Sequence, residues 1–217
     1  ALPAGADAAR AFVLEVGTEE LPPDDVELAL EQLRAKVPAL LEKLRLGHKG
    51  VRVEGTPRRL AVIVDALAAR QTSVEEQVRG PPAKAAFNAD GTPSKALEGF
   101  CKKNGVDVSS VTRAPDAKGV EYVYATVKDA GRAAAEVLCD ELPALLGSIS
   151  FKRSMRWRGD AAFSRPVRWL LALHGDTEVP CVWAGCAGGA VTRVLRNAAT
   201  PEIRVPSAEA YESTLAA

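Results

Sequence analysis

The hydrophobic period changes repeatedly in the first third of the chain, and this order of periods limits the folds that it can adopt. Residues 11–17 (AFVLEVG) are apolar, β-branched and aromatic, and a glycine ends them, so they are predicted as a strand. Apolar residues then recur at helical spacing over residues 26–44, which predicts a helix capped by Asp24 or Asp25. A kink or restart is expected at Pro38.

Two further strands, VRVEGT and RRLAVIVDAL, are predicted on either side of a turn at residues 56–59. Later strand candidates are WLLALHG, TEVPCVWAG, AVTRVLRN and PEIRVP, and the end of the chain, SAEAYESTLAA, reads as a helix. The order of elements predicts an α+β fold, with a mixed or antiparallel sheet and packed helices.

The middle of the chain has a weaker pattern, and residues 71–148 are predicted as an inserted subdomain that is largely helical and loop. It contains the loop-like run RGPPAKAAFNADGTP, a helix capped by Ser94, a strand at 120–128 and a helix at 132–146. Residues 11–217 as a whole are predicted as one α+β region, and the Ala/Gly-rich residues 1–10 are expected to be poorly ordered.

The charge balance restricts how the chain could bind nucleic acid. Basic and acidic residues are equal, at 28 each, so an RNA contact would have to come from a local basic patch. No apolar run reaches the ~20 residues of a membrane helix, and no membrane partner is predicted. The four cysteines and two histidines lack zinc spacing, so no metal site is predicted. Free buried thiols are expected, and a disulfide between Cys181 and Cys186 stays open.

No catalytic residue is predicted, because the chain has neither a P-loop nor a supported Ser/His/Asp or Cys/His set. Glu15, Glu19 and Glu20 gather around the end of the first predicted strand. Such carboxylates could bind a metal or act as acid and base, or Glu19 and Glu20 could cap or counter basic residues elsewhere. The second interpretation is favoured, since charged turns are usually structural or solvated.

Two basic features could bind phosphate. Arg58 and Arg59 follow Pro57 at a turn, where guanidinium groups could bind phosphate or pair with the glutamates. The segment 151–169 (FKRSMRWRGDAAFSRPVRW) has six basic residues against one acidic residue, with Trp157 and Trp169 interleaved. Such a strip could contact nucleic acid, with tryptophan stacking on unpaired bases. Alternatively, the tryptophans are core residues and the arginines bind acidic groups of this chain or of a partner.

Several long strings together resemble the β subunits of glycyl-tRNA synthetases. They are FVLEVGTEELPP, TPRRLAVIV, VRGPP with FNADGTPSKALEGFCKKNGV, and SMRWRGDAAFSRPVRWLLALHG. These blocks follow one another in order from residue 12 to about residue 175 and are far more specific than a short motif. At residues 194–197 the chain has VLRN where bacterial members usually show a GHRF-like string. That departure resembles the plant and algal organellar type, in which α and β regions are fused.

The resemblance implies a part in the ATP-dependent attachment of glycine to its tRNA. In that family the α subunit carries catalysis, so no cofactor is expected in this chain, whereas ATP and Mg²⁺ are implied for the full enzyme. The implied partners are glycine tRNA and the α subunit or α region. The implied location is a plastid or mitochondrion for the plant or algal type, and otherwise the bacterial cytoplasm.

The residues that we expect to contact tRNA phosphates and the acceptor arm are Arg58, Arg59, Lys152, Arg153, Arg156, Arg158 and Arg165, with Trp157 stacking or packing in the core. A second hypothesis makes the chain a protein-interaction module that docks on the α catalytic region through the same arginines. A hydrolytic editing activity is a third hypothesis, but the sequence shows no set of residues for it.

Overall fold

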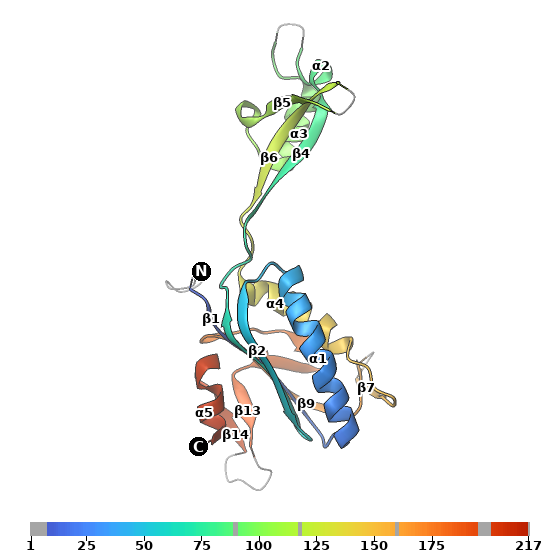
Figure 1. Ribbon diagram of the computed structural model, residues 1–217, viewed down its shortest axis with the longest axis vertical. Coiled ribbons are helices and arrows are strands. Elements are labelled where there is room, and N and C mark those ends of the chain that lie inside the picture. The colour runs from blue at the N-terminus through green and yellow to red at the C-terminus, as the bar shows by residue number, and fades with distance from the viewer. Residues whose placement is uncertain (1–7, 89–90, 117–118, 159–160, 195–200, 217) are drawn as a thin grey trace. The chain divides into compact units, whose positions relative to one another are not determined.

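The computed structural model describes residues 8–88, 91–116, 119–158, 161–194 and 201–216, with only the backbone described at Trp157 and Arg158. It has two compact units, of which the first comprises Ala1–Thr72 and Arg132–Ala217 and the second Ser73–Gly131. The second unit is thus inserted in the sequence between two parts of the first (Figure 1).

A mixed sheet forms the centre of the first unit, with the strand order β11–β12–β9–β1–β3–β2 and with β10 beside β9. The bounds are β1 Arg10–Thr18, β2 His48–Thr56, β3 Arg59–Leu67, β9 Val167–His174, β10 Thr177–Glu178, β11 Val182–Trp183 and β12 Cys186–Gly189. β1 is antiparallel to both β3 and β9, whereas β12 is parallel to β9. The α+β class and the strands at residues 11–17 and on either side of the 56–59 turn are therefore confirmed.

Both faces of this sheet are covered. Helices α1 (Pro23–Lys43) and α4 (Ala134–Gly147) share one core with Phe12, Leu14 and Val16 of β1. The alternate residues Ala11 and Val13 belong to a second core, which includes residues of the C-terminal elements. Those elements are β13 (Val191–Arg193), β14 (Glu202–Arg204), the 3-10 turn η2 (Ala208–Ala210) and α5 (Tyr211–Ala216). Burial on both faces explains why β1 is apolar at nearly every position except Glu15.

The start of α1 differs from the prediction. Its N-cap is Pro22, no side chain caps the helix, and Pro23 occupies the first turn. Proline suits that position because its missing N–H would have no partner there. Asp24 and Asp25 lie inside the first turn, where their charge complements the helix dipole. The helix also continues through Pro38 without a restart.

The second unit is a small sheet with helical elements. Its strands β4 (Val74–Pro82), β6 (Glu121–Asp129) and β5 (Thr112–Pro115) pair antiparallel, with β6 in the middle. The helical elements are α2 (Ala83–Ala86), α3 (Lys95–Asn104) and η1 (Val108–Ser110). Ser94 caps α3 as predicted, by accepting from the backbone N–H of Leu97.

The inserted region therefore differs from the largely helical and looped subdomain expected at residues 71–148. Two of its three strands, β4 and β5, were not predicted, because proline and glycine interrupt the strand pattern in β4 and β5 is short. The predicted range also includes α4, which belongs to the first unit.

The first unit also contains a separate pair of strands. β7 (Met155–Arg158) and β8 (Ala161–Phe163) form a two-stranded antiparallel sheet of their own.

Cys181 and Cys186 are both free thiols, so the disulfide that the sequence left open is not formed. Burial raises the pKa of Cys181 to about 11, which keeps it a neutral thiol. No helix in the described part of the chain is long and apolar enough to cross a membrane.

The close contact between Gly17 and Trp169 gives a first test of the sheet. An added Cβ at Gly17 would lie 1.9 Å from Cδ2 of Trp169, inside the ring's van der Waals radius. We expect Gly17→Ala to lower the free energy of unfolding by about 1–3 kcal/mol, because a well-packed core must shift. Tryptophan fluorescence during urea unfolding reports this directly, since all three tryptophans lie in the first unit.

Gly47→Ala is the matched control, because the nearest atom to its added Cβ is the Cβ of Ala68 at 3.9 Å. It should leave the unfolding free energy within about 1 kcal/mol. Equal effects of the two substitutions would contradict the packing of Trp169 on Gly17.

An ion pair between Arg10 and Glu209 holds η2 against β1 and predicts a pH dependence. The Nε of Arg10 lies 2.8 Å from Oε1 of Glu209, and the hydrogen bond from Arg10 lowers the pKa of Glu209 to about 2. Because the folded pKa lies below the unfolded value, this contact stabilises the fold above about pH 4.5 and is lost as the pH falls toward 2. We expect Glu209→Gln to be less stable than the parent at neutral pH, with the difference shrinking below about pH 4.5. Thermal unfolding of both proteins across this range measures the difference, and a constant difference would refute the assignment.

Candidate functional site

A fully buried carboxylate lies at the centre of the first unit. Glu15 of β1 is 0% exposed, and its side chain accepts hydrogen bonds from the indole N–H of Trp169, the hydroxyl of Thr192 at 2.7 Å and the hydroxyl of Tyr211. The Nε of Arg59 lies 3.2 Å from its Oε2. A buried carboxylate is tolerated only when it is paired and hydrogen-bonded, and here both conditions are met. We call these five residues the Glu15 cluster.

The Glu15 cluster fixes the position of Arg59. The guanidinium of Arg59 also donates to Oγ1 of Thr192 at 3.4 Å and to the carbonyl of Arg193. Burial, and then the charge of Glu15, raise the pKa of Tyr211, so its hydroxyl remains a hydrogen-bond donor. Arg59 is therefore engaged inside the protein, and its contact with tRNA stays a prediction.

The three glutamates considered together in the sequence lie in different surroundings. Glu15 points into the core, Glu19 is 3.2 Å from Nε of Arg168, and Glu20 lines a cleft beside Arg58 and Arg59. No group of three potential metal ligands occurs in the part of the chain that the structure describes. The interpretation that Glu19 and Glu20 counter basic residues holds for Glu19, and the pairing of Glu15 with Arg59 was not predicted.

Two adjoining pockets of about 490 and 450 Å³ form this cleft, and Arg58, Trp169, Arg193 and Val194 line both. We call them the arginine cleft. Arg193 is 2.8 Å from Oε1 of Glu202. By contrast, the buried Nε of Arg58 has no hydrogen-bond partner among the described residues. Arg58 thus lines both pockets without an ion pair to a described carboxylate, whereas Arg59 and Arg193 are paired with Glu15 and Glu202.

The residues of the basic strip, 151–169, have different surroundings. Trp169 is 8% exposed and belongs to the Glu15 cluster, so the core interpretation holds for it. Lys152, Arg153 and Arg156, on and just before β7, are exposed and form no ion pair with a described carboxylate. Arg165 is also exposed and donates to the carbonyl of Ser164 at 3.2 Å. The side chains of Trp157 and Arg158 lie outside the described residues.

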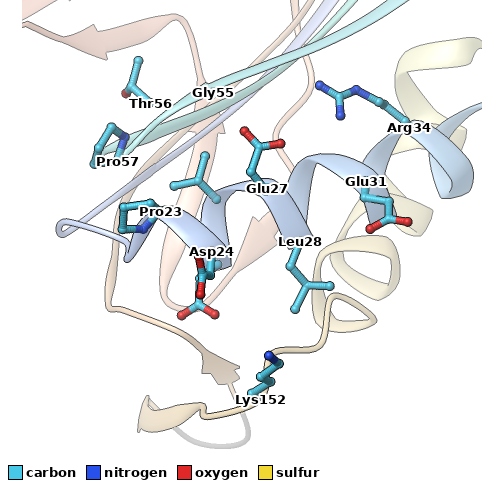
Figure 2. Close-up of a pocket in the computed structure, with 12 residues that line it drawn as sticks. Pro23, Asp24, Glu27, Leu28, Glu31, Arg34, Gly55, Thr56, Pro57 and Lys152 are labelled. Atoms are coloured by element: carbon cyan, nitrogen blue, oxygen red, sulfur yellow. The ribbon is translucent and has the colours of Figure 1, made fainter.

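A groove of about 740 Å³ runs along the first half of α1. Lys152 lines this groove, whereas Arg153 and Arg156 do not. The groove is also lined by carboxylates of α1 and by the β2–β3 turn. Figure 2 shows Lys152 across from Asp24 and Leu28. Carboxylates repel phosphate, so Lys152 is in a poorer place to bind RNA than Arg153 and Arg156.

Comparison with known proteins identifies the family. The family model described as glycyl-tRNA synthetase beta subunit matches residues 12–217. The chain belongs to this family. The match covers all four blocks that carried the resemblance in the sequence, from residue 12 to about residue 175.

Named relatives agree with this assignment. The chain is 50% identical over 206 residues to "Glycine--tRNA ligase, chloroplastic/mitochondrial 2" of Arabidopsis thaliana, covering 95% of this chain and 19% of the relative. It is 42% identical over 209 residues to the glycine–tRNA ligase beta subunit of Moorella thermoacetica, covering 95% of this chain and 30% of the relative. The corresponding protein of Acaryochloris marina is 44% identical over 78% of this chain and 24% of its own length. The chain thus spans under a third of these relatives.

The Glu15 cluster can be tested by removing the charge alone. We expect Glu15→Gln to lower the unfolding free energy by about 3 kcal/mol, because Arg59 loses its buried partner. Glu54→Gln removes a largely exposed carboxylate from β2 and should cost under about 1 kcal/mol. Urea unfolding followed by tryptophan fluorescence compares the two. Similar stabilities of the two variants would contradict a structural role for the buried charge.

Proposed function

We propose that this chain is the N-terminal part of the β region of a glycine–tRNA ligase and that its first unit contacts tRNA. Family membership and the printed names of the relatives support the ligase assignment. Because the chain covers under a third of those relatives, the proposal assigns the adenylation site, with its ATP and Mg²⁺, to other segments of the ligase, the α region. The chain itself then serves tRNA binding and subunit assembly.

The observation that carries the tRNA contact is the set of exposed cations on the β7–β8 hairpin and beside it. Arg153, Arg156 and Arg165 are exposed, and none is paired with a described carboxylate, in a protein whose overall charge is zero. Guanidinium groups bind phosphate oxygens through planar paired donors, and unpaired ones need not give up an internal partner first. Arg58, which lines both pockets of the arginine cleft, adds a further guanidinium.

The other residues expected to contact tRNA would contribute in different ways. Arg59 would act by positioning the β2–β3 turn, since its guanidinium pairs with Glu15. Lys152 faces the carboxylates of α1 across the groove and would contribute less. Contacts by Arg158 and stacking by Trp157 stay predictions, because their side chains lie outside the described residues.

A specific observation also favours a protein partner at the same hairpin. Met155 is 46% exposed, and it lies next to Arg156 on β7. Protein interfaces are enriched in methionine and arginine, so this surface could dock on the α catalytic region instead.

The name of the Arabidopsis relative supports a plastid or mitochondrion as the location, and the bacterial relatives support a bacterial cytoplasm as the alternative.

Binding of glycine tRNA to the purified chain, over a range of salt concentrations, tests the proposal. We expect the double variant Arg153→Ala/Arg156→Ala to bind more weakly, because two phosphate contacts are lost. The slope of log affinity against log salt should fall by about 1.5 to 2. The control Lys43→Ala/Lys49→Ala removes two exposed cations at the other end of α1 and the start of β2, and should leave the slope unchanged.

Equal losses in both double variants would mean that the hairpin has no special role in RNA binding. Unchanged tRNA binding by Arg153→Ala/Arg156→Ala, together with loss of association with the α region, would favour the docking interpretation. A non-cognate tRNA is measured in the same way. Weaker binding of this tRNA would mean that the contact recognises glycine tRNA, and equal binding would mean that it recognises phosphate alone.

A further inference from the structure

The tRNA contacts proposed above all lie in the first unit. The second unit has a sheet face that takes no part in them. In this sheet β6 is the middle strand, and its side chains alternate between the two faces. Val123 and Ala125 are 0% exposed, and Val123 shares a core with residues of α2 and α3. The intervening residues Tyr122 and Tyr124 therefore point to the opposite face, which we call the tyrosine face.

Strand register shows what surrounds the two tyrosines. Tyr124 pairs with Arg79 of β4 and with Thr112 of β5, and residues paired across antiparallel strands share a face. The next pair along β6 is Thr126 with Gln77. These flanking residues are exposed, whereas the tyrosines are half-buried. Hydroxyl, amide and guanidinium groups thus border two aromatic rings in the middle of an open sheet.

Arg79 is already arranged as a stacking group. Its Cζ lies 3.4 Å from the ring centroid of Tyr122, and an ion pair of 3.6 Å with Asp116 steadies it. The side chain remains 50% exposed, so the guanidinium plane has a side open to solvent. Unpaired nucleobases stack on aromatic rings and on guanidinium planes alike, and their edges are read by polar side chains nearby.

The composition of the tyrosine face favours RNA over a protein partner. No leucine, isoleucine or valine occupies its described paired positions, while Val74, Val78 and Val123 lie on the other side of the sheet. The buried centre of a protein interface is usually apolar. Pro82 and Ala114 flank Tyr122, and the rest of the face, two tyrosines with arginine, glutamine and threonine, matches the groups that hold single-stranded nucleic acid.

We propose that the tyrosine face binds unpaired nucleotides of RNA, by stacking bases on Tyr124 and on the Arg79–Tyr122 pair. This inference rests on the proposed function, that the chain handles tRNA, and it assigns the unpaired part of the molecule to the second unit. The β7–β8 hairpin of the first unit would bind the phosphates of base-paired tRNA segments.

The test uses the whole chain with a short unstructured single-stranded RNA and, separately, a duplex RNA of the same length. We expect Tyr122→Leu/Tyr124→Leu to weaken single-strand binding about 25-fold or more, because each of the two lost stacks costs roughly fivefold or more. Tyr122→Phe/Tyr124→Phe keeps both rings and should bind within about twofold of the parent. Lys102→Ala/Lys103→Ala, on α3, is the control with exposed cations on another element of the same unit.

The salt dependence separates this inference from the hairpin contacts. The leucine pair should weaken affinity at every salt concentration without changing the slope, since stacking releases no counterions. Circular dichroism and thermal unfolding of the leucine pair establish that the second unit remains folded.

Unchanged single-strand binding by the folded leucine pair would overturn the inference, even if Arg153→Ala/Arg156→Ala still weakened tRNA binding. Loss of association with the α region, with RNA binding intact, would likewise overturn it and make the tyrosine face a protein interface.

Discussion

The buried charge of Glu15 is the interaction on which the first unit depends. It lies in β1, between β3 and β9, where an unpaired carboxylate would cost several kcal/mol. Its partners come from β3, β9, β13 and the start of α5, so satisfying this one charge brings separate parts of the chain together. The second core packs on the same face, and its apolar contacts and the Glu15 cluster therefore reinforce each other.

The arginines near the Glu15 cluster and those near β7 have different partners. Arg59, Arg168 and Arg193 are paired with Glu15, Glu19 and Glu202, and they hold the protein together. Arg156 on β7 and Arg153 just before it have no described carboxylate partner, and they can bind an external anion without breaking an internal pair. A chain of zero net charge can thus present a local binding surface for RNA.

Periodicity was enough to predict β1, β3, β9 and most of α1, because each has a long uninterrupted apolar pattern. β4 and β12 were missed since proline or glycine interrupts them, and only pairing with β6 and β9 makes them strands. A glutamate inside AFVLEVG signals a buried partner, but its identity could not be predicted: Tyr211 lies 196 residues away, and only the tertiary fold brings it near. The exposed arginines were found because charge clustering is local in sequence.

The central claim is that the first unit, held together by Glu15, contacts RNA through the β7–β8 hairpin. The most direct test is amide hydrogen exchange of the whole chain, measured with and without saturating glycine tRNA. The account predicts slower exchange in β7 and β8 on binding, with little change in β1, whose amides are already paired on both sides. Unchanged exchange in β7 and β8 while tRNA is bound would contradict it, and would move the RNA contact to another surface of the protein.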